Sequence, residues 1–469
     1  MNIESVSAKE KAAAKTAANQ MESSGHRAGN SRRGIRVRMY RQGLGDCFLI
    51  TLPKADRGNC FVMIDCGVIL GTPEAGTKMR RVVEDISTVT GGNLDLLVAT
   101  HEHWDHLSGF LQAQDLFEKL AVKQVWLSWT EDPDDGLGKE LRNEHIALRN
   151  GLAAASVRMR LGGSANNRLD SMLEFFGAKG QGTTSDALKF VKTLCRPQDL
   201  HYCRPSDPPR ILPQTSARFY VLGPPHDKKM IMKYNPSKAH PETYGLAMVE
   251  SRAFQLMSNS GGRDAPFDNV QQIPLAATVG VEFFRRHYWG ADQDYPDDGD
   301  QEWRRIDSEW LDQASSLALQ LDNATNNTSL ALAIELEDGD VLLFAADAQV
   351  GNWLSWQELS WKDSQGKLIS GPDLLKRTVL YKVGHHCSHN ATLREKGLEQ
   401  MESLFWALIP VDHAMALKKG WGKMPLPELE RALKEKTQGR LIRVDDAALS
   451  AAAANGGATM TDLFIEVGL

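Results

Sequence analysis

A short apolar strand that runs directly into a histidine-rich segment constrains this chain more than any other feature of its sequence. Leu94–Ala99 reads as a buried strand, and the residues THEHWDH (100–106) follow it at once. In an extended backbone, side chains two positions apart point the same way, so His101 and His103 converge on one point. Two neutral imidazoles at one point suit a divalent ion such as zinc. The Asp and His that end the segment turn away from this pair and can serve a second ion.

Apolar runs and alternation predict a mixed α/β chain in two halves separated by a long stretch. Strands are expected over Ile35–Tyr40, Asp46–Leu52, Asn59–Ile64, Leu94–Ala99, Gln124–Leu127, Arg218–Leu222, Ser329–Glu335, Asp340–Ala345, Thr378–Val383, Ser403–Ile409, Leu441–Val444 and Leu463–Val467. Helices are expected over Met79–Thr90, Leu107–Leu120, Leu137–Leu161, Asn167–Phe176, Ser185–Leu194 and Leu426–Lys434. Two such halves can stack as an α/β sandwich.

Four motifs occur in the order found in one known family. The histidine-rich segment resembles the HxHxDH signature of the metallo-β-lactamase superfamily. Met63–Gly67 and Phe344–Asp347 resemble two strand ends of that family, and Lys382–Ser388 resembles its late histidine motif. The resemblance implies a four-layer αββα sandwich and a centre of two divalent metal ions.

The domain organisation follows from where these motifs lie. Residues 1–33 are rich in Ala, Lys, Ser, Asn and Gly, which predicts a flexible tail. The family-like segments fall within one domain over 34–469. Two stretches have no counterpart among them and are interpreted as insertions, one helical at about 132–210 and one mixed at about 226–325.

Further segments are similar to the soluble nuclease-like domain of the competence protein ComEC. Gly43–Ile50 is similar to its GQGDxxLI segment, and Asn326–Leu330 and the late motif KVGHHCS are similar to two others. No window approaches the roughly 18 uninterrupted apolar residues of a membrane helix, so the chain is expected to be a free-standing version without a membrane partner. Scattered cysteines and the lack of an apolar leader favour a cytoplasmic location.

The resemblance also implies roles for individual residues. The metal ligands would be His101, His103, Asp105, His106, Asp347 and His386, with Zn²⁺ as the expected ion and Mn²⁺ as the other candidate. Asp347 would bridge the two ions, and either Asp105 or the metal-bound hydroxide itself would handle the proton. His385 or Lys382 would stabilise negative charge that develops on the substrate. The roles of His385 and His386 could also be reversed.

Several positions stay open from the sequence alone. Lactamase-type members supply a third histidine to the first metal after a middle strand; His226 could be that ligand or a surface loop residue, and a residue from an insertion could replace it. Asp65 is expected to orient a ligand histidine rather than bind metal. Asp46 could cap a turn or line the site. Cys387 stands where the family usually has glycine, and it could be a ligand or a packed residue.

These features predict a metal-dependent hydrolase in which two metal ions activate a hydroxide. The ComEC-like segments favour a phosphodiesterase or nuclease acting on DNA or RNA, in DNA processing or defence. The formal net charge of −6 does not favour nucleic acid by bulk charge, although residues 366–443 hold 14 basic against 8 acidic residues. The alternatives are a hydrolase of a small ester, lactone or phosphoester, and a non-catalytic subunit whose insertions bind a protein partner.

Overall fold

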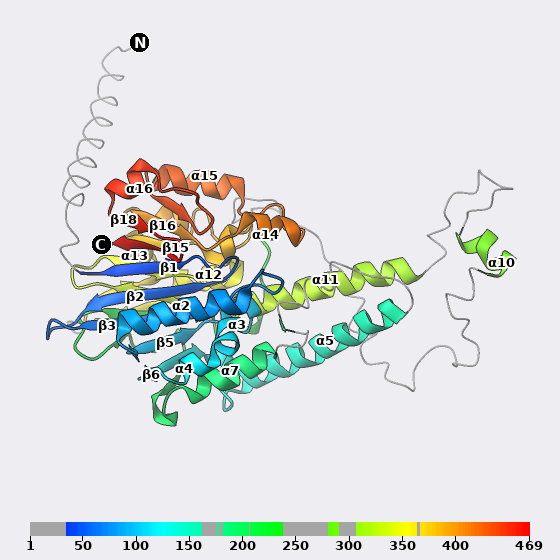
Figure 1. Cartoon of the computed structure of the whole chain (residues 1–469), viewed down its shortest axis with the longest axis horizontal. Helices are drawn as coiled ribbons and strands as arrows, with labels where there is room; N and C mark the ends of the chain where they lie inside the picture. Colours follow the sequence, from blue (N-terminus) through cyan, green and yellow to red (C-terminus); the bar gives the residue numbers. More distant parts are fainter. Residues whose placement is uncertain are drawn as a thin grey trace, which may run out of the picture.

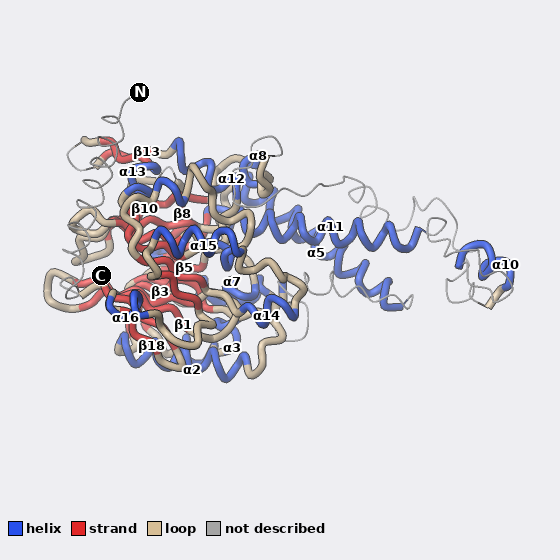
Figure 2. Tube along the Cα trace, turned by 90° about the horizontal axis from the view of Figure 1, so that it is seen from above, coloured by secondary structure: helices blue, strands red, loops and turns tan. Residues whose placement is uncertain are grey.

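Two large β-sheets and the helices around them make up the body of the protein (Figures 1 and 2). The computed structural model describes residues 34–161, 176–177, 182–205, 207–237, 280–289, 306–363 and 366–469. The tail expected at 1–33, most of the helix expected at Asn167–Phe176 and much of the stretch at 226–325 lie outside the described residues. The mixed α/β class predicted from the sequence is confirmed.

The first sheet has eight strands in the order β18-β19-β1-β2-β3-β5-β7-β8. Their bounds are β1 Arg36–Tyr40, β2 Cys47–Pro53, β3 Asn59–Cys66, β5 Leu96–Ala99, β7 Val125–Ser128, β8 Leu200–Cys203, β18 Ala458–Met460 and β19 Phe464–Gly468. β1, β2 and β3 form an antiparallel meander, and β3, β5, β7 and β8 run parallel. β8 adds an edge strand within the stretch that was expected to be mostly helical.

The second sheet has seven strands in the order β17-β16-β15-β12-β11-β10-β9. Their bounds are β9 Arg210–Ile211, β10 Arg218–Gly223, β11 Ala331–Glu335, β12 Val341–Phe344, β15 Thr378–Lys382, β16 Trp406–Ile409 and β17 Leu441–Arg443. Strands β9 to β12 pair antiparallel, whereas β12, β15, β16 and β17 run parallel. All the strands expected from the sequence are therefore present, with ends shifted by a few residues.

One hydrophobic cluster combines residues of both sheets. On β2, Phe48 and Ile50 belong to this shared cluster, whereas Leu49 between them packs toward the helices. This alternation is the two-residue period of a strand with both faces covered. The ring of Phe48 lies 5.6 Å from that of Phe344 on the other sheet, measured between centroids. The two sheets therefore pack face to face through their inner side chains.

Helices cover the remaining face of each sheet (Figure 1). Those packed on the first sheet are α2 Ala75–Thr90, α3 Trp104–Gln112, α4 Gln114–Phe117 and α7 Thr184–Thr193. Those packed on the second are α11 Ile306–Asn327, α12 Val350–Ser355, α13 Gly371–Lys376, α14 His413–Lys418 and α15 Pro427–Lys436. On α2, the buried residues Met79, Val82, Val83 and Ile86 recur at the three- and four-residue spacing of one helix face. The single helix expected over Leu107–Leu120 is divided at Ala113.

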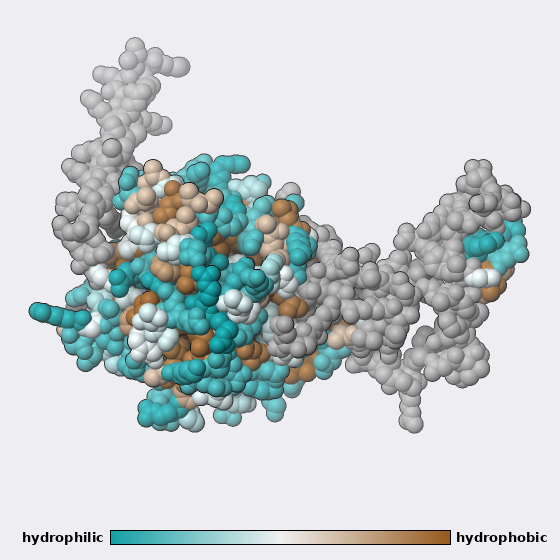
Figure 3. Space-filling view, viewed as in Figure 1, coloured by the Kyte–Doolittle hydropathy of each residue, from teal (hydrophilic) through white to brown (hydrophobic). Residues whose placement is uncertain are grey.

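The long helix α5, Gly136–Leu161, packs along α11, and the pair extends from the body in both views (Figures 1 and 2). The smaller elements are β4 Asn93–Leu94, β6 Ala121–Val122, β13 Ser360–Lys362, β14 Leu368–Ser370, α8 Lys228–Ile231, α10 Glu282–Phe284 and α16 Ala451–Asn455. On the face drawn in Figure 3, hydrophilic residues alternate with small hydrophobic areas. Among the described helices, none combines the length and the apolar character needed to cross a membrane.

The parallel strands of both sheets end on the side where the polar motifs lie. Asp65 lies near the end of β3, and β5 leads into the histidine-rich segment. β12 and β15 lead into Asp347 and the late histidine motif. The carboxyl ends of parallel strands are the usual place for functional side chains in α/β folds. The chain order thus brings motifs nearly 300 residues apart to one place, where His386 lies 281 positions from its partner Asp105.

Candidate metal centre

Four imidazoles converge between the ends of the two sheets. His101 and His103 lie in the loop after β5, His106 lies in the first turn of α3, and His386 follows β15. The ring centroids of His101 and His106 are 4.2 Å apart, and those of His106 and His386 are 5.9 Å apart. All four residues are buried. Both sheets therefore contribute histidines to the same small volume.

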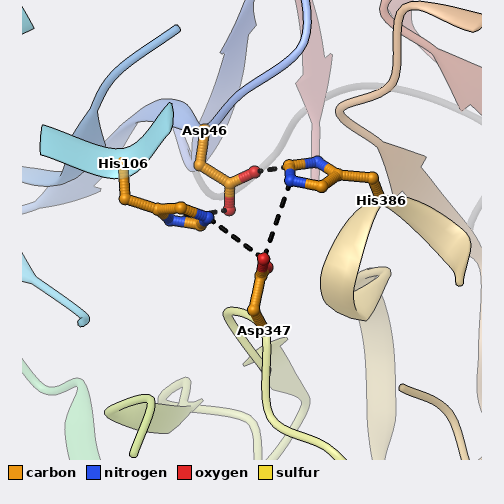
Figure 4. Close-up of side chains that lie close together, drawn as sticks. All are labelled: Asp46, His106, Asp347 and His386. Atoms are coloured by element: carbon orange, nitrogen blue, oxygen red, sulfur yellow. Dashed lines mark ion pairs between the residues drawn. The ribbon is translucent and has the colours of Figure 1, made fainter. Parts of the chain in front are cut away.

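A buried group of two carboxylates and two imidazoles could hold a metal ion. Asp46, His106, Asp347 and His386 each offer one ligand atom, and these atoms lie within 4.8 Å of one another (Figure 4). Asp347 Oδ2 lies 3.2 Å from His106 Nε2 and 3.6 Å from His386 Nε2. Asp347 thus stands between histidines that follow strands of different sheets.

Asp105 adds a third carboxylate to this group. Its Oδ2 lies 2.9 Å from His386 Nε2 and 3.8 Å from His106 Nε2. Its Oδ1 is buried and has no hydrogen-bond partner among the described residues. A buried carboxylate oxygen without a partner is costly unless a cation or a bound molecule compensates it.

His101 and His103 form the pair expected from their spacing. His101 Nε2 lies 3.1 Å from His103 Nδ1, and the backbone at His103 is extended, with φ −117° and ψ 152°. Burial lowers the pKa of both rings, that of His103 to about 3. Both rings are therefore neutral at physiological pH, which is the form of imidazole that binds metal ions.

The nitrogens that face away from the centre are held by fixed partners. His106 Nδ1 lies 2.8 Å from Asp65 Oδ2, and His386 Nδ1 lies 2.8 Å from the carbonyl oxygen of Pro410. His101 Nδ1 lies 3.1 Å from the hydroxyl of the preceding threonine. Partners of this kind fix the tautomer and aim the other nitrogen at a metal. Asp65 occupies the orienting place that the sequence predicts for it.

Lys382 lies inside the centre with all three of its N–H groups engaged. Its Nζ is 2.5 Å from Asp46 Oδ2, 3.3 Å from Asp347 Oδ1 and 2.9 Å from the carbonyl oxygen of Ala346. Burial acts to lower the pKa of Lys382, but Asp46 and Asp347 outweigh it and leave this pKa raised. The ammonium group therefore holds two carboxylates in place.

Opposite charges set the protonation states around Asp347. Burial acts to raise the pKa of Asp347, but His106, Lys382 and His386 outweigh it and hold this pKa well below its ordinary value. Burial acts to lower the pKa of His106, but Asp347, Asp46 and Asp105 outweigh it and raise this pKa. The centre is therefore strongly polarised, with ionised carboxylates packed against nitrogen groups.

The late histidine motif has a strained backbone. His385, His386 and Cys387 have φ values of 42°, 51° and 67°, in the left-handed region that non-glycine residues rarely occupy. His386 is buried against the carboxylates, whereas His385 beside it is half-buried. Cys387 lies in the hydrophobic cluster of the second sheet, so it packs in the core instead of facing the metal-binding group.

One candidate ligand, His226, lies away from the centre, whereas two residues not assigned as ligands from the sequence, Asp46 and Asp322, lie in it or against it. The side chain of His226 is 50% exposed, and its ring pairs with Asp135 and lies against Trp129. Asp46 belongs to the centre, although its sequence context favoured a turn cap over a place in the site. Asp322 on α11 is the second added residue. Its Oδ1 lies 3.6 Å from His103 Nε2, and it belongs to no motif recognised in the sequence.

Comparison of the sequence with models of known protein families finds no match, and comparison with curated proteins finds none either.

Proposed function

We propose that the chain is a metal-dependent hydrolase that binds two divalent metal ions between its two sheets. The observation that supports this proposal best is that the buried imidazoles of His106 and His386 meet the carboxylate of Asp347, with the His101 and His103 pair directly beside His106. Imidazole with carboxylate is a ligand set for Zn²⁺ and also accommodates Mn²⁺. Asp46 and Asp105 each have a buried carboxylate oxygen without a hydrogen bond from the described residues, which fits a site that takes up cations.

The proposal assigns the ligands to two ions. His101 Nε2 and His103 Nδ1 would hold the first ion, and Asp105, His106 and His386 would hold the second. Asp347 would be shared. We further interpret the helix, sheet, sheet, helix order as the four-layer αββα sandwich of the metallo-β-lactamase superfamily, with the stretches at about 132–210 and 226–325 as its insertions.

Divalent ions held in this way would polarise the scissile group and lower the pKa of a water molecule toward neutrality. The chain's own residues then have separate tasks. Asp105 offers an unpartnered carboxylate oxygen that can accept the proton of the attacking water. Lys382 holds Asp347 and Asp46 in position. His385 is the histidine of the late motif that is open enough to face a substrate.

We favour a phosphodiester substrate, which makes the protein a nuclease acting on DNA or RNA. Two of the ComEC-like segments contribute side chains at the centre. Asp46 belongs to Gly43–Ile50 and pairs with Lys382, and Asn326 belongs to Asn326–Leu330 and lies 3.3 Å from His385. Two segments that resemble ComEC therefore lie beside the residues proposed to act in hydrolysis. A role in DNA processing or defence would follow from this substrate.

A second candidate substrate is a small ester, lactone or phosphoester. The observation that favours it is the depth of the centre, because His101, His103, His106 and His386 are each at most 4% exposed. A small molecule reaches such a site more easily than a duplex does.

The test is a hydrolysis assay on the purified full chain with labelled single- and double-stranded DNA, RNA, a bis-phosphodiester chromogen and a lactone. Each reaction runs with Zn²⁺, with Mn²⁺ and with EDTA. We expect metal-dependent cleavage of a nucleic acid that His386→Ala abolishes and the control His226→Ala retains. Turnover of only the lactone or a small ester would favour the second candidate. Cleavage that survives EDTA and His386→Ala would contradict the metal-dependent mechanism.

A further inference from the structure

A buried carboxyl group on α11 lies against the candidate metal centre. Asp322 is 6% exposed, and its Oδ1 lies 3.6 Å from His103 Nε2. That oxygen has no hydrogen-bond partner among the described residues. α11 comes from the stretch between the two halves of the chain, outside every motif that the sequence singles out.

The position of Asp322 relative to the imidazole ring defines what it can do. His103 Nδ1 faces His101 Nε2 at 3.1 Å, so Nδ1 is the nitrogen turned toward the first proposed ion. The two nitrogens of an imidazole point in diverging directions. Asp322 faces Nε2, on the outer side of the ring, where it is badly placed to share an ion with Nδ1.

The same arrangement occurs at a second histidine of the centre. His106 turns Nε2 toward Asp347 and presents Nδ1 to the carboxylate of Asp65. A carboxylate on the outer nitrogen fixes the ring and makes the inner nitrogen a stronger ligand. Asp322 faces the outer nitrogen of His103 in the same way, at 3.6 Å instead of the 2.8 Å between Asp65 and His106.

Asn326 holds the second oxygen of Asp322. It lies one helical turn further along α11, and its Nδ2 is 3.4 Å from Asp322 Oδ2 and 3.3 Å from His385 Nε2. One face of α11 therefore contacts a proposed ligand of the first ion and the histidine proposed to face the substrate.

We propose that Asp322 is a positioning residue that accepts a hydrogen bond from His103 Nε2–H and aims Nδ1 at the first metal ion. This inference rests on the proposed metal-dependent function. It gives α11 a role in the first metal site. The loop after β10 supplies no histidine to that site, because its His226 pairs with Asp135. Removal of such a partner costs about 10–100-fold in metal affinity.

The test is a titration of the chelator-treated full chain with Co²⁺, followed by visible absorption and calorimetry. We expect two ions to bind the wild type. Asp322→Ala should still bind two, with the affinity of one weakened about 10–100-fold. Asp322→Asn keeps an acceptor oxygen and should recover part of the loss. The control Thr325→Ala removes a side-chain hydrogen bond internal to α11 and should leave both affinities unchanged.

A spectroscopic readout separates positioning from general stability. In the Co²⁺ form, the exchangeable Nε2–H proton of His103 should give a shifted NMR signal that Asp322→Ala loses by faster exchange with water. Circular dichroism checks that each variant folds. If Asp322→Ala does not fold, Asp322→Asn replaces it in the metal titration and the NMR measurement.

The outcomes are distinct. Wild-type affinities and an unchanged Nε2–H signal in Asp322→Ala would overturn the inference and leave the metal centre intact. Complete loss of one ion in both Asp322 variants, at saturating Co²⁺, would make Asp322 a direct ligand and overturn the positioning role. A wild-type chain that binds no Co²⁺ would overturn the proposed function and this inference together.

Discussion

The carboxylate of Asp347 is in contact with three nitrogen groups of the centre. Its oxygens lie 3.2 Å from His106 Nε2, 3.3 Å from Lys382 Nζ and 3.6 Å from His386 Nε2, and all of these side chains are buried. Removing one partner from a buried charged network leaves the others uncompensated, which costs about 3–5 kcal/mol. Stability and metal binding should therefore respond together to changes at this position.

Asp347→Asn is expected to remove most bound metal and to lower the free energy of unfolding by several kcal/mol, because the isosteric amide cannot balance Lys382 and His106. Elemental analysis and urea unfolding measure the two effects. The control Asp227→Asn changes an exposed aspartate that caps a short helix, and it should change metal content little. Unaltered metal content in Asp347→Asn would rule out its place between the ions.

The sequence predicts part of this centre for physical reasons. Period-two spacing after a strand was enough to pair His101 with His103, and the pair lies together in the structure. The spacing says nothing about Asp46, because a turn cap and a ligand look alike in a glycine-flanked loop. Asp322 was missed because a lone aspartate on a helix has no spacing relation to a motif more than 200 residues away.

At the scale of elements, the first turn of α3, which carries Asp105 and His106, is packed directly against the backbone that follows β3. A Cβ atom at Gly67 would lie 2.3 Å from the carbonyl carbon of Asp105 and 2.5 Å from the amide nitrogen of His106. Such distances leave no room for any side chain. Glycine at this position therefore sets how closely the first turn of α3 approaches the backbone after β3.

Gly67→Ala is expected to displace Asp105 and His106, to weaken metal binding and to destabilise the fold by about 1–3 kcal/mol. The matched control is Gly76→Ala in α2, where a Cβ meets nothing within 4 Å and alanine favours the helix. Metal titration and thermal unfolding of both variants measure the difference. Equal metal affinity in the two variants would contradict the packing argument.

Asp95 joins three elements near the start of β5. It accepts hydrogen bonds from Lys54 at 2.8 Å, Lys123 at 2.7 Å and the backbone N–H of Phe61 at 2.9 Å. Burial acts to raise the pKa of Asp95, but these hydrogen bonds outweigh it and leave this pKa below its ordinary value. The stabilisation is therefore present above the unfolded-state pKa of about 3.9 and is lost as pH falls through the lower folded-state pKa.

Asp95→Asn should lower the free energy of unfolding by about 1 kcal/mol at pH 7, since Lys123 is largely exposed and its contribution is screened. The difference between variant and wild type should shrink as the pH falls below 4. Urea unfolding at pH 7 and pH 3 measures it. A difference that stays constant across this range would show that the charge of Asp95 is not what matters.

The elements themselves were mostly predictable, and the exceptions have physical causes. Long amphipathic patterns such as that of α2 and short apolar strands such as β5 are local signals. β8 was missed because its four residues, Leu200–Cys203, form a strand through pairing with β7, and nothing local marks them. α11 was missed because polar and acidic residues before it obscure its apolar face.

For the whole molecule, the centre joins side chains that follow strands of both sheets, in addition to the apolar packing between the sheets and hydrogen bonds such as that from Arg41 to the carbonyl oxygen of Val444. His101, His103 and His106 come from the first sheet, and Asp347 and His386 come from the second. This arrangement requires both sheets to be folded, because the ligands are distant in the chain. Metal ions should therefore bind the folded chain far better than the unfolded one.

Metal binding should accordingly stabilise the whole chain. At a free metal concentration 100 times the dissociation constant, one site contributes about 2.7 kcal/mol. EDTA is expected to lower the melting temperature of the wild type and to have a smaller effect on His386→Ala. Differential scanning calorimetry with and without EDTA measures both shifts. An equal shift in the two proteins would place the stabilising metal outside this centre.

The metal content of the purified full chain tests the central claim most directly. After dialysis against Zn²⁺ and removal of the excess, elemental analysis should find roughly two zinc ions per chain. His386→Ala should retain fewer, and the control His226→Ala should retain both. A wild-type chain without bound zinc, or a His386→Ala variant with the same zinc content as the wild type, would contradict the account.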